Sequence, residues 1–247
     1  MSLPAARADE GIARALLRAQ PQRFARQPLT ATMFASVRAR AHATLALAFA
    51  LLALAALLTA LIGDAPLSRH LSSRFWVAGQ RSLLKWLTDA GLYAGYACFI
   101  ALLVLGWWRR QRLWFEVARV WLAAQLIGGL LVVRVLKMWI AHPRPDTGAG
   151  DAPLQWLGLT WNAAYNSFPS GHSADIATSA FCLCLLLARP WQRAWVLGFA
   201  ALIGLTRILL AKHWASDVLA GSAVGLTVAA LIAGFWLRRL ATGDAPA

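Results

Sequence analysis

The sequence predicts an all-α membrane protein, a bundle of about six transmembrane helices with both termini in the cytoplasm. Of its 247 residues, 60% are hydrophobic and 14% are charged, whereas soluble domains are about half apolar and about a quarter charged. The apolar residues come in long blocks, and a helix needs about 20 mostly apolar residues to span a bilayer. Basic residues flank the blocks, as they do in membrane proteins. The blocks cover residues 43–62, 91–108, 115–141, 172–187, 194–211 and 217–237.

The positions of the basic residues determine the predicted orientation. Most of them precede the first block or follow the second, fourth and sixth, and cytoplasmic loops are the ones enriched in lysine and arginine. Four basic residues between the first two blocks weaken this bias. We expect a basic cytoplasmic segment (1–42), a transmembrane domain (43–239) and a short tail (240–247). Residues 9–20 suit either an amphipathic helix on the inner leaflet or a loosely ordered basic tail.

The formal net charge of +14 and the three cysteines restrict the classes of partner. Because the arginines flank apolar blocks, anionic lipid headgroups are expected as partners and nucleic acid is not. Cys98, Cys182 and Cys184 lie inside apolar blocks, and no Cys/His spacing typical of a metal site occurs. We therefore expect neither a metal nor another cofactor, and the oligomeric state is unknown at this stage.

Three polar clusters lie at the ends of these blocks, in residues 137–145, 168–172 and 206–217. The third block runs outward and ends just after Lys137, and the fourth begins at His172 and runs inward. The fifth block carries Arg207 near its outer end, and the sixth begins at Asp217. All three clusters are therefore predicted to meet at the external face of the membrane. Such a meeting favours a functional site, because intramembrane charges usually mark function.

The cations and the helix start in these clusters suit a phosphate ester. Lys137, Arg144 and Arg207 supply three positive charges, and arginine can hold phosphate oxygens with two parallel hydrogen bonds. Ser170 and Gly171 stand where a helix is predicted to begin, and the free N–H groups at a helix start bind anions.

Two histidines and a carboxylate complete the inventory. A neutral imidazole can attack phosphorus, and a second one can protonate the leaving oxygen. His172 and His213 could divide these tasks, and Asp217, four residues after His213, could orient its ring and stabilise the cation formed.

At these residues the chain resembles the type 2 phosphatidic acid phosphatase family, whose fold is shared with vanadium haloperoxidases and some bacterial acid phosphatases. The family signature reads Lys-x6-Arg-Pro, then Pro-Ser-Gly-His, then Ser-Arg-x5-His-x3-Asp. Residues 137–217 match it with one departure, because Thr206 stands in place of the serine and keeps its hydroxyl.

The resemblance implies a role for each matching position. His213 corresponds to the nucleophile that forms a phosphohistidine, Asp217 to its orienting carboxylate, and His172 to the general acid. The family uses no metal. The phosphate cradle corresponds to Lys137, Arg144, Ser170, Gly171 and Arg207.

On this resemblance we expect a phosphatase for a lipid phosphate or diphosphate in the bacterial inner membrane, with its site facing the periplasm or exterior. Undecaprenyl diphosphate, phosphatidic acid, phosphatidylglycerol phosphate and the 1-phosphate of lipid A are all candidate substrates. Two alternatives stay open: a phosphotransferase that passes the phosphate to another lipid, and a non-catalytic lipid-binding or transport protein. Headgroup choice is expected to depend on residues 146–168 and 67–87, since loops carry specificity.

One structural ion pair is also predicted. Arg134 lies three residues before Lys137 on an outward-running helix, and Asp175 lies three after His172 on an inward-running one. Both should therefore lie about one turn deeper than the site, at a similar depth. We expect them to pair with each other, the alternative being that Arg134 is a fourth phosphate ligand.

Overall fold

The computed structural model describes residues 31–73, 80–145 and 159–242, so the expectation for residues 9–20 lies outside the described residues. The described part is helical and contains no strand, which confirms the all-α prediction. Its elements are α2 (Ala31–Leu61), α3 (Asp64–Ser73), α4 (Gln80–Trp108), α5 (Arg112–Ala124), η1 (Gln125–Val132), α6 (Val133–Ile140), η3 (Ala163–Tyr165), α7 (Gly171–Leu186), α8 (Pro190–Leu209) and α9 (Ala215–Thr242).

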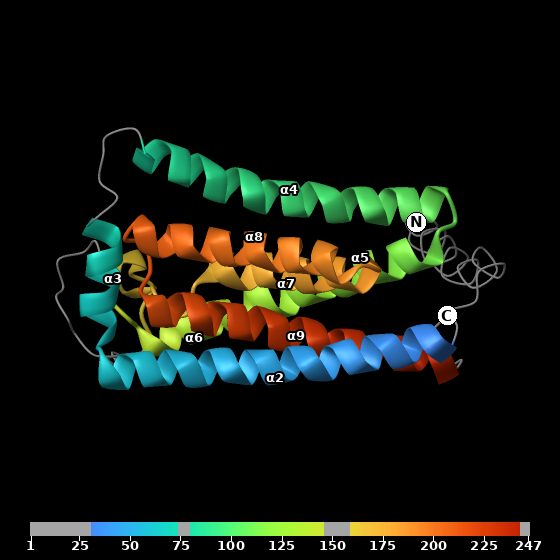
Figure 1. Ribbon diagram of the computed structural model, residues 1–247, viewed down its shortest axis with the longest axis horizontal. Helices are drawn as coiled ribbons and strands as arrows, with labels where there is room; N and C mark the ends of the chain where they lie inside the picture. Colours follow the sequence, from blue (N-terminus) through green and yellow to red (C-terminus); the bar gives the residue numbers. More distant parts are fainter. Residues whose placement is uncertain (1–30, 74–79, 146–158, 243–247) are drawn as a thin grey trace, which may run out of the picture.

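The long helices lie side by side along one axis, and α3 lies across one end of the bundle (Figure 1). Helix α2 starts and α9 finishes at the opposite end. Helix α3 packs against α8 and α9 through Leu67 and Leu71, which contact Ile208, Ala215 and Val218. The end covered by α3 is therefore the one where α9 begins.

Five helical segments are long and apolar enough to cross a membrane: α2, α4, α5–η1–α6, α8 and α9. The predicted fourth span, α7, has 16 residues and rises about 24 Å, against about 30 Å for the hydrocarbon core. It contacts α4, α5, α8 and α9, and most of its side chains are buried. A count of six spans therefore stays a prediction.

Helix α2 begins earlier than the apolar block suggests, so residues 31–42 are part of a helix. Arg40 lies in this stretch, and its Nη1 donates to the carbonyl oxygens of Cys184 (2.8 Å) and Leu185 (3.1 Å). These carbonyls belong to the last turn of α7, where a basic side chain commonly satisfies them. Part of the predicted N-terminal segment thus joins the bundle.

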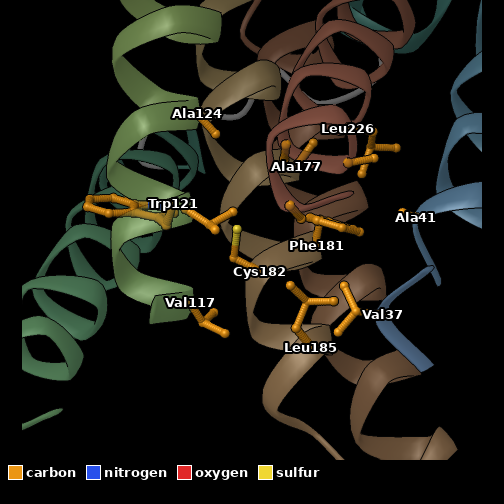
Figure 2. Packing of buried hydrophobic residues seen from close by; sticks show 14 of the residues in the cluster. Val37, Ala41, Val117, Trp121, Ala124, Ala177, Phe181, Cys182, Leu185 and Leu226 are labelled. Carbon is orange, nitrogen blue, oxygen red and sulfur yellow. The ribbon is translucent and has the colours of Figure 1, made fainter. Parts of the chain in front are cut away.

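The core lies in the half of the bundle away from α3. Small side chains such as Ala124, Ala177 and Cys182 let the helices approach closely (Figure 2). Trp121 stacks on Phe99 with ring centroids 4.8 Å apart. Large apolar side chains also cover the outside of the bundle, as expected where the surrounding medium is lipid.

Helices α7 and α9 touch through backbone at two glycines. A Cβ atom on Gly221 would lie 2.3 Å from the Ser170 carbonyl oxygen, and one on Gly225 would lie 2.2 Å from that of Ala174. No larger residue fits at either position unless the two helices separate.

We predict that Gly225→Ala lowers the thermal unfolding temperature in detergent, with a cost of about 1–3 kcal/mol from overpacking. The matched control is Gly234→Ala in the same helix, where an added Cβ meets nothing within 4 Å. That control should be neutral or slightly stabilising, because alanine is the better helix former. Equal unfolding temperatures for the two variants would contradict the close contact between α7 and α9.

Candidate functional site

The three clusters meet at the end of the bundle beside α3, as the sequence predicts. Lys137 lies near the end of α6, His172 in the first turn of α7, and Arg207 near the end of α8. His172 lies within electrostatic range of Lys137, Arg144, Arg207 and His213. The structure thus brings residues of all three clusters together.

Asp217 is the centre of the hydrogen-bond network. Its side chain is fully buried in the first turn of α9. Its carboxylate accepts hydrogen bonds from His142 Nδ1 (2.9 Å), Ser167 Oγ (2.5 Å) and the Trp214 backbone N–H (2.9 Å). A buried charge persists only when it is paired and hydrogen-bonded, and these three donors meet that requirement.

His213 is held by the same network. Its Nδ1 lies 3.3 Å from Ser167 Oγ and 3.6 Å from Asp217 Oδ2. The Ser167 hydroxyl gives its one proton to Asp217, so towards His213 it can only accept a hydrogen bond. His213 Nδ1 therefore carries the proton, and Nε2 keeps a free lone pair, as a nucleophile requires.

The protonation of His213 agrees with this arrangement. Burial lowers the pKa of His213 from 6.5 to about 4, against the opposing effect of Asp217. Burial penalises the charged imidazolium, so the ring is neutral at pH 7.

The chain reaches both buried histidines through a left-handed residue at a helix end. Ala211 has φ 53°, and the N–H groups of Lys212 and His213 both donate to the Arg207 carbonyl, at 3.0 and 3.3 Å. Ala141, which has φ 51°, ends α6 directly before His142. Each left-handed residue follows the end of its helix, and the histidine that comes after it lies against Asp217.

Two cations of the site, Lys137 and Arg207, differ in whether protein groups satisfy their N–H donors. Lys137 Nζ donates to the carbonyls of Asn166 (2.8 Å) and Ser167 (3.2 Å), so it holds the segment that supplies Ser167. Arg207 Nε is buried and has no hydrogen-bond partner within the described residues. A buried donor of this kind suits an anion, because leaving it unsatisfied is costly.

Ser170 is the N-cap of α7, as its position in the sequence suggests. Its hydroxyl accepts hydrogen bonds from the Ser173 backbone N–H (3.4 Å) and hydroxyl (2.9 Å). Its own N–H donates to the Asp217 carbonyl at 2.9 Å. The start of α7, including Gly171, is thus fixed directly against the start of α9.

Four contributing residues were not predicted from the sequence: His142, Ser167, Asp64 and Ser68. His142 lies inside the first cluster, and Ser167 directly precedes the second. For His142, the signal available in the sequence was a histidine between Lys137 and Arg144. No spacing rule links it to Asp217, which lies 75 residues away.

Helix α3 caps α9 from another part of the chain. Ser68 Oγ accepts a hydrogen bond from the Ala215 N–H (3.0 Å), and Asp64 accepts from the Ser216 N–H (3.1 Å) and hydroxyl. These N–H groups have no partner inside the helix, and a carboxylate also complements the helix dipole. Burial raises the pKa of Asp64, and its bonds to Ser216 oppose that rise.

The direct Arg134–Asp175 ion pair that the sequence predicts is not formed within 4 Å in the described part of the chain. Arg134 lies within electrostatic range of Asp175 but does not contact it. Asp175 accepts a hydrogen bond from the Tyr96 hydroxyl at 2.8 Å, and Arg134 is exposed. A Cβ on Gly129 would lie 2.6 Å from Asp175 Oδ1, so the glycine of the π-helical turn η1 gives this carboxylate its space. Tyr96 on α4, and not Arg134 on α6, is therefore the side chain that bonds to Asp175.

Comparison with known sequences identifies the family. Residues 118–240 match the profile of the PAP2 superfamily. The chain belongs to the PAP2 superfamily. It is 31% identical over 117 residues to a lipid A 1-phosphatase of Rhizobium etli. The aligned region covers 47% of this chain and 50% of the relative. It is 27% identical over 179 residues to a lipid A 1-phosphatase of Rhizobium johnstonii. That alignment covers 69% of this chain and 72% of the relative.

A solved structure shares the fold of this PAP2 chain. The crystal structure of a transmembrane PAP2 type phosphatidylglycerolphosphate phosphatase from Bacillus subtilis matches with a TM-score of 0.53 and 24% identity. The match covers 79% of this chain and 96% of that one. The chain therefore has the helical architecture of a membrane PAP2 protein.

We predict that His142→Ala destabilises this PAP2 domain by about 1–3 kcal/mol, the cost of leaving a buried acceptor without its partner. The variant removes the donor to Asp217 Oδ1 and should lower the unfolding temperature in detergent. His42→Ala, at an exposed position on α2, is the matched control. An unfolding temperature unchanged in His142→Ala would show that Asp217 does not depend on this contact.

Proposed function

We propose that the protein is an integral membrane phosphatase that removes phosphate from a lipid phosphate or lipid diphosphate through a phosphohistidine on His213. One observation carries the proposal. His213 is neutral and buried, its Nδ1 is engaged by Ser167 and Asp217, and its Nε2 is the remaining nitrogen. A neutral imidazole whose ring is oriented by a carboxylate is the arrangement that covalent phosphoryl transfer to histidine requires.

The other residues have roles that follow from charge and position. His213 Nε2 attacks phosphorus, the bond to the leaving oxygen breaks, and His172 gives that oxygen a proton. Water then attacks the phosphohistidine, and His172 takes up a proton from it. Charge on the transferred group is stabilised by Lys137, Arg144 and Arg207 and by the helix start at Ser170 and Gly171.

The cradle needs no metal in this proposal, because fixed cations supply the charge stabilisation. Relatives named as lipid A 1-phosphatases support a lipid phosphate as the substrate class. The phosphotransferase alternative shares the first half of the reaction and differs only in the final acceptor. Release of inorganic phosphate from a purified lipid separates the two.

The non-catalytic alternative differs in the covalent step. A binding or transport protein on this scaffold would take up lipid phosphate without transferring phosphate to His213. Brief mixing with a lipid whose phosphate is radiolabelled, followed by alkaline quench, would trap a phosphohistidine, which is stable to alkali and labile to acid. A labelled protein band with that stability supports the enzyme.

The chain is an integral membrane protein, and we propose the bacterial inner membrane with the site facing outward. The basic residues at the α2 start and in the connections near Arg110 and Arg189 support this orientation, because they lie at the end opposite the site. Anionic lipid headgroups are the proposed partners of those residues.

We predict that His213→Ala reduces phosphate release from a lipid phosphate by at least about a hundredfold, since a lost covalent step cannot be replaced by the cradle. Wild-type protein, His213→Ala and the exposed-position control His42→Ala are compared at equal concentration in detergent. Monodispersity on gel filtration establishes that each variant is folded. More than about a hundredth of the wild-type rate in His213→Ala would exclude this nucleophile.

We predict that a cysteine at Ala163 reacts with a membrane-impermeant maleimide in intact cells. Ala163 is exposed in the loop before α7, at the site end of the bundle. The matched position is Ala188, exposed just after the other end of α7, which should react only after permeabilisation. Both are made in a background where Cys98 and Cys184 are replaced by serine. The reverse labelling pattern would place the site in the cytoplasm.

A further inference from the structure

A cavity opens beside the proposed catalytic residues, on the side of the site that faces α4. Its volume is about 340 Å³. His172 and Arg207 line this cavity, so it adjoins the site directly. The charged side chains that line it elsewhere are Arg81, Lys85, Asp89 and Lys212.

The charged wall of the cavity comes from one face of α4. Arg81, Lys85 and Asp89 follow each other at intervals of four residues, which places them on the same side of the helix. Next to them, Leu83 and Trp86 are exposed on the outside of the bundle. The first turns of α4 therefore present charge towards the site and apolar surface towards lipid.

A buried hydrogen bond fixes this face of α4 beside the site. The hydroxyls of Thr88 and Thr206 bond to each other, and both side chains are fully buried. Thr206 directly precedes Arg207, and Thr88 lies within one turn of Lys85. The basic face of α4 is thus held against the end of α8 by a contact that is independent of substrate.

The position of the cavity relative to the reacting groups indicates what it holds. Its walls include His172, the proposed proton donor to the leaving oxygen, and do not include the nucleophile His213 or the cradle residue Lys137. In an in-line displacement the leaving group lies opposite the nucleophile. The cavity is therefore on the leaving-group side of the transferred phosphate.

We propose that Arg81, Lys85 and Lys212 form a second anion subsite, which binds a phosphoryl group carried by the leaving group. The proposal rests on the proposed function and refines it, because it makes a lipid diphosphate or another substrate with a neighbouring phosphate the preferred class. Among the described residues, this cavity is lined by Arg81, Lys85, Lys212 and Arg207 and by one carboxylate, Asp89, so the charge of the described lining is positive. A positive lining on the leaving-group side favours a leaving group that carries negative charge over a neutral alcohol.

The reaction balances with water as the only co-reactant. His213 Nε2 forms a bond to the terminal phosphorus, and the bond from that phosphorus to the bridging oxygen breaks. The bridging oxygen stays with the lipid phosphate, which leaves with its charge held by Lys85 and Arg81 and with a proton from His172. Water releases inorganic phosphate from His213 in the second step.

The test compares farnesyl diphosphate with farnesyl monophosphate, which share a tail and differ in the charge of the leaving group. We expect the wild-type kcat/KM to favour the diphosphate. Lys85→Gln, and separately Arg81→Gln, should lower the diphosphate-to-monophosphate ratio of kcat/KM by about tenfold, the effect of one charge-assisted hydrogen bond. Arg109→Gln, exposed just after the other end of α4, is the matched control and should leave the ratio unchanged.

A binding measurement separates failure of the subsite from failure of the proposed function. A non-hydrolysable farnesyl methylenediphosphonate should bind wild-type protein about tenfold more tightly than farnesyl phosphonate, and Lys85→Gln should abolish that difference. Preferential binding without phosphate release from either substrate would overturn the proposed function and retain the subsite. Equal affinity for the two phosphonates, or an unchanged kcat/KM ratio in both variants, would overturn the subsite.

Discussion

The negative charge of Asp217 has to be satisfied without water, and the geometry of the site depends on that constraint. A fully buried carboxylate is tolerated only where donors surround it. Here the donors come from the turn after α6 (His142), the segment before α7 (Ser167) and the turn before α9 (Trp214). One buried charge therefore holds three distant parts of the chain together, and His213 takes its tautomer from the same network.

Close packing sets the spacing that this network needs. The α7 and α9 backbones touch where Gly221 meets the Ser170 carbonyl, and the Ser170 N–H bonds to the Asp217 carbonyl. His172 lies in α7 and His213 lies two residues before α9, so this contact between main chains sets the spacing of the proposed proton donor and the proposed nucleophile. Precise placement of this kind accounts for much of the rate that phosphoryl transfer enzymes achieve.

Much of this arrangement could be predicted from the sequence, and the rest could not for physical reasons. Apolar blocks and polar block ends predicted the bundle and the meeting of Lys137, His172 and Asp217, because helix length and direction are local properties. Four residues could not be predicted, because contacts between distant parts of the chain leave no periodic pattern in the sequence. They are His142, Ser167, Asp64 and Ser68. The direct Arg134–Asp175 contact was predicted from residue spacing on two helices alone, and that spacing could not reveal that Tyr96, on a third helix, bonds to Asp175.

The capping of α9 by α3 has a consequence for biosynthesis. Asp64 and Ser68 are translated about 150 residues before Ala215 and Ser216, whose N–H groups they satisfy. Asp217 is likewise synthesised 75 residues after His142 and 50 residues after Ser167, two of its donors. The nascent chain therefore holds lipid-facing helices such as α2 and α4 well before the network around Asp217 can form.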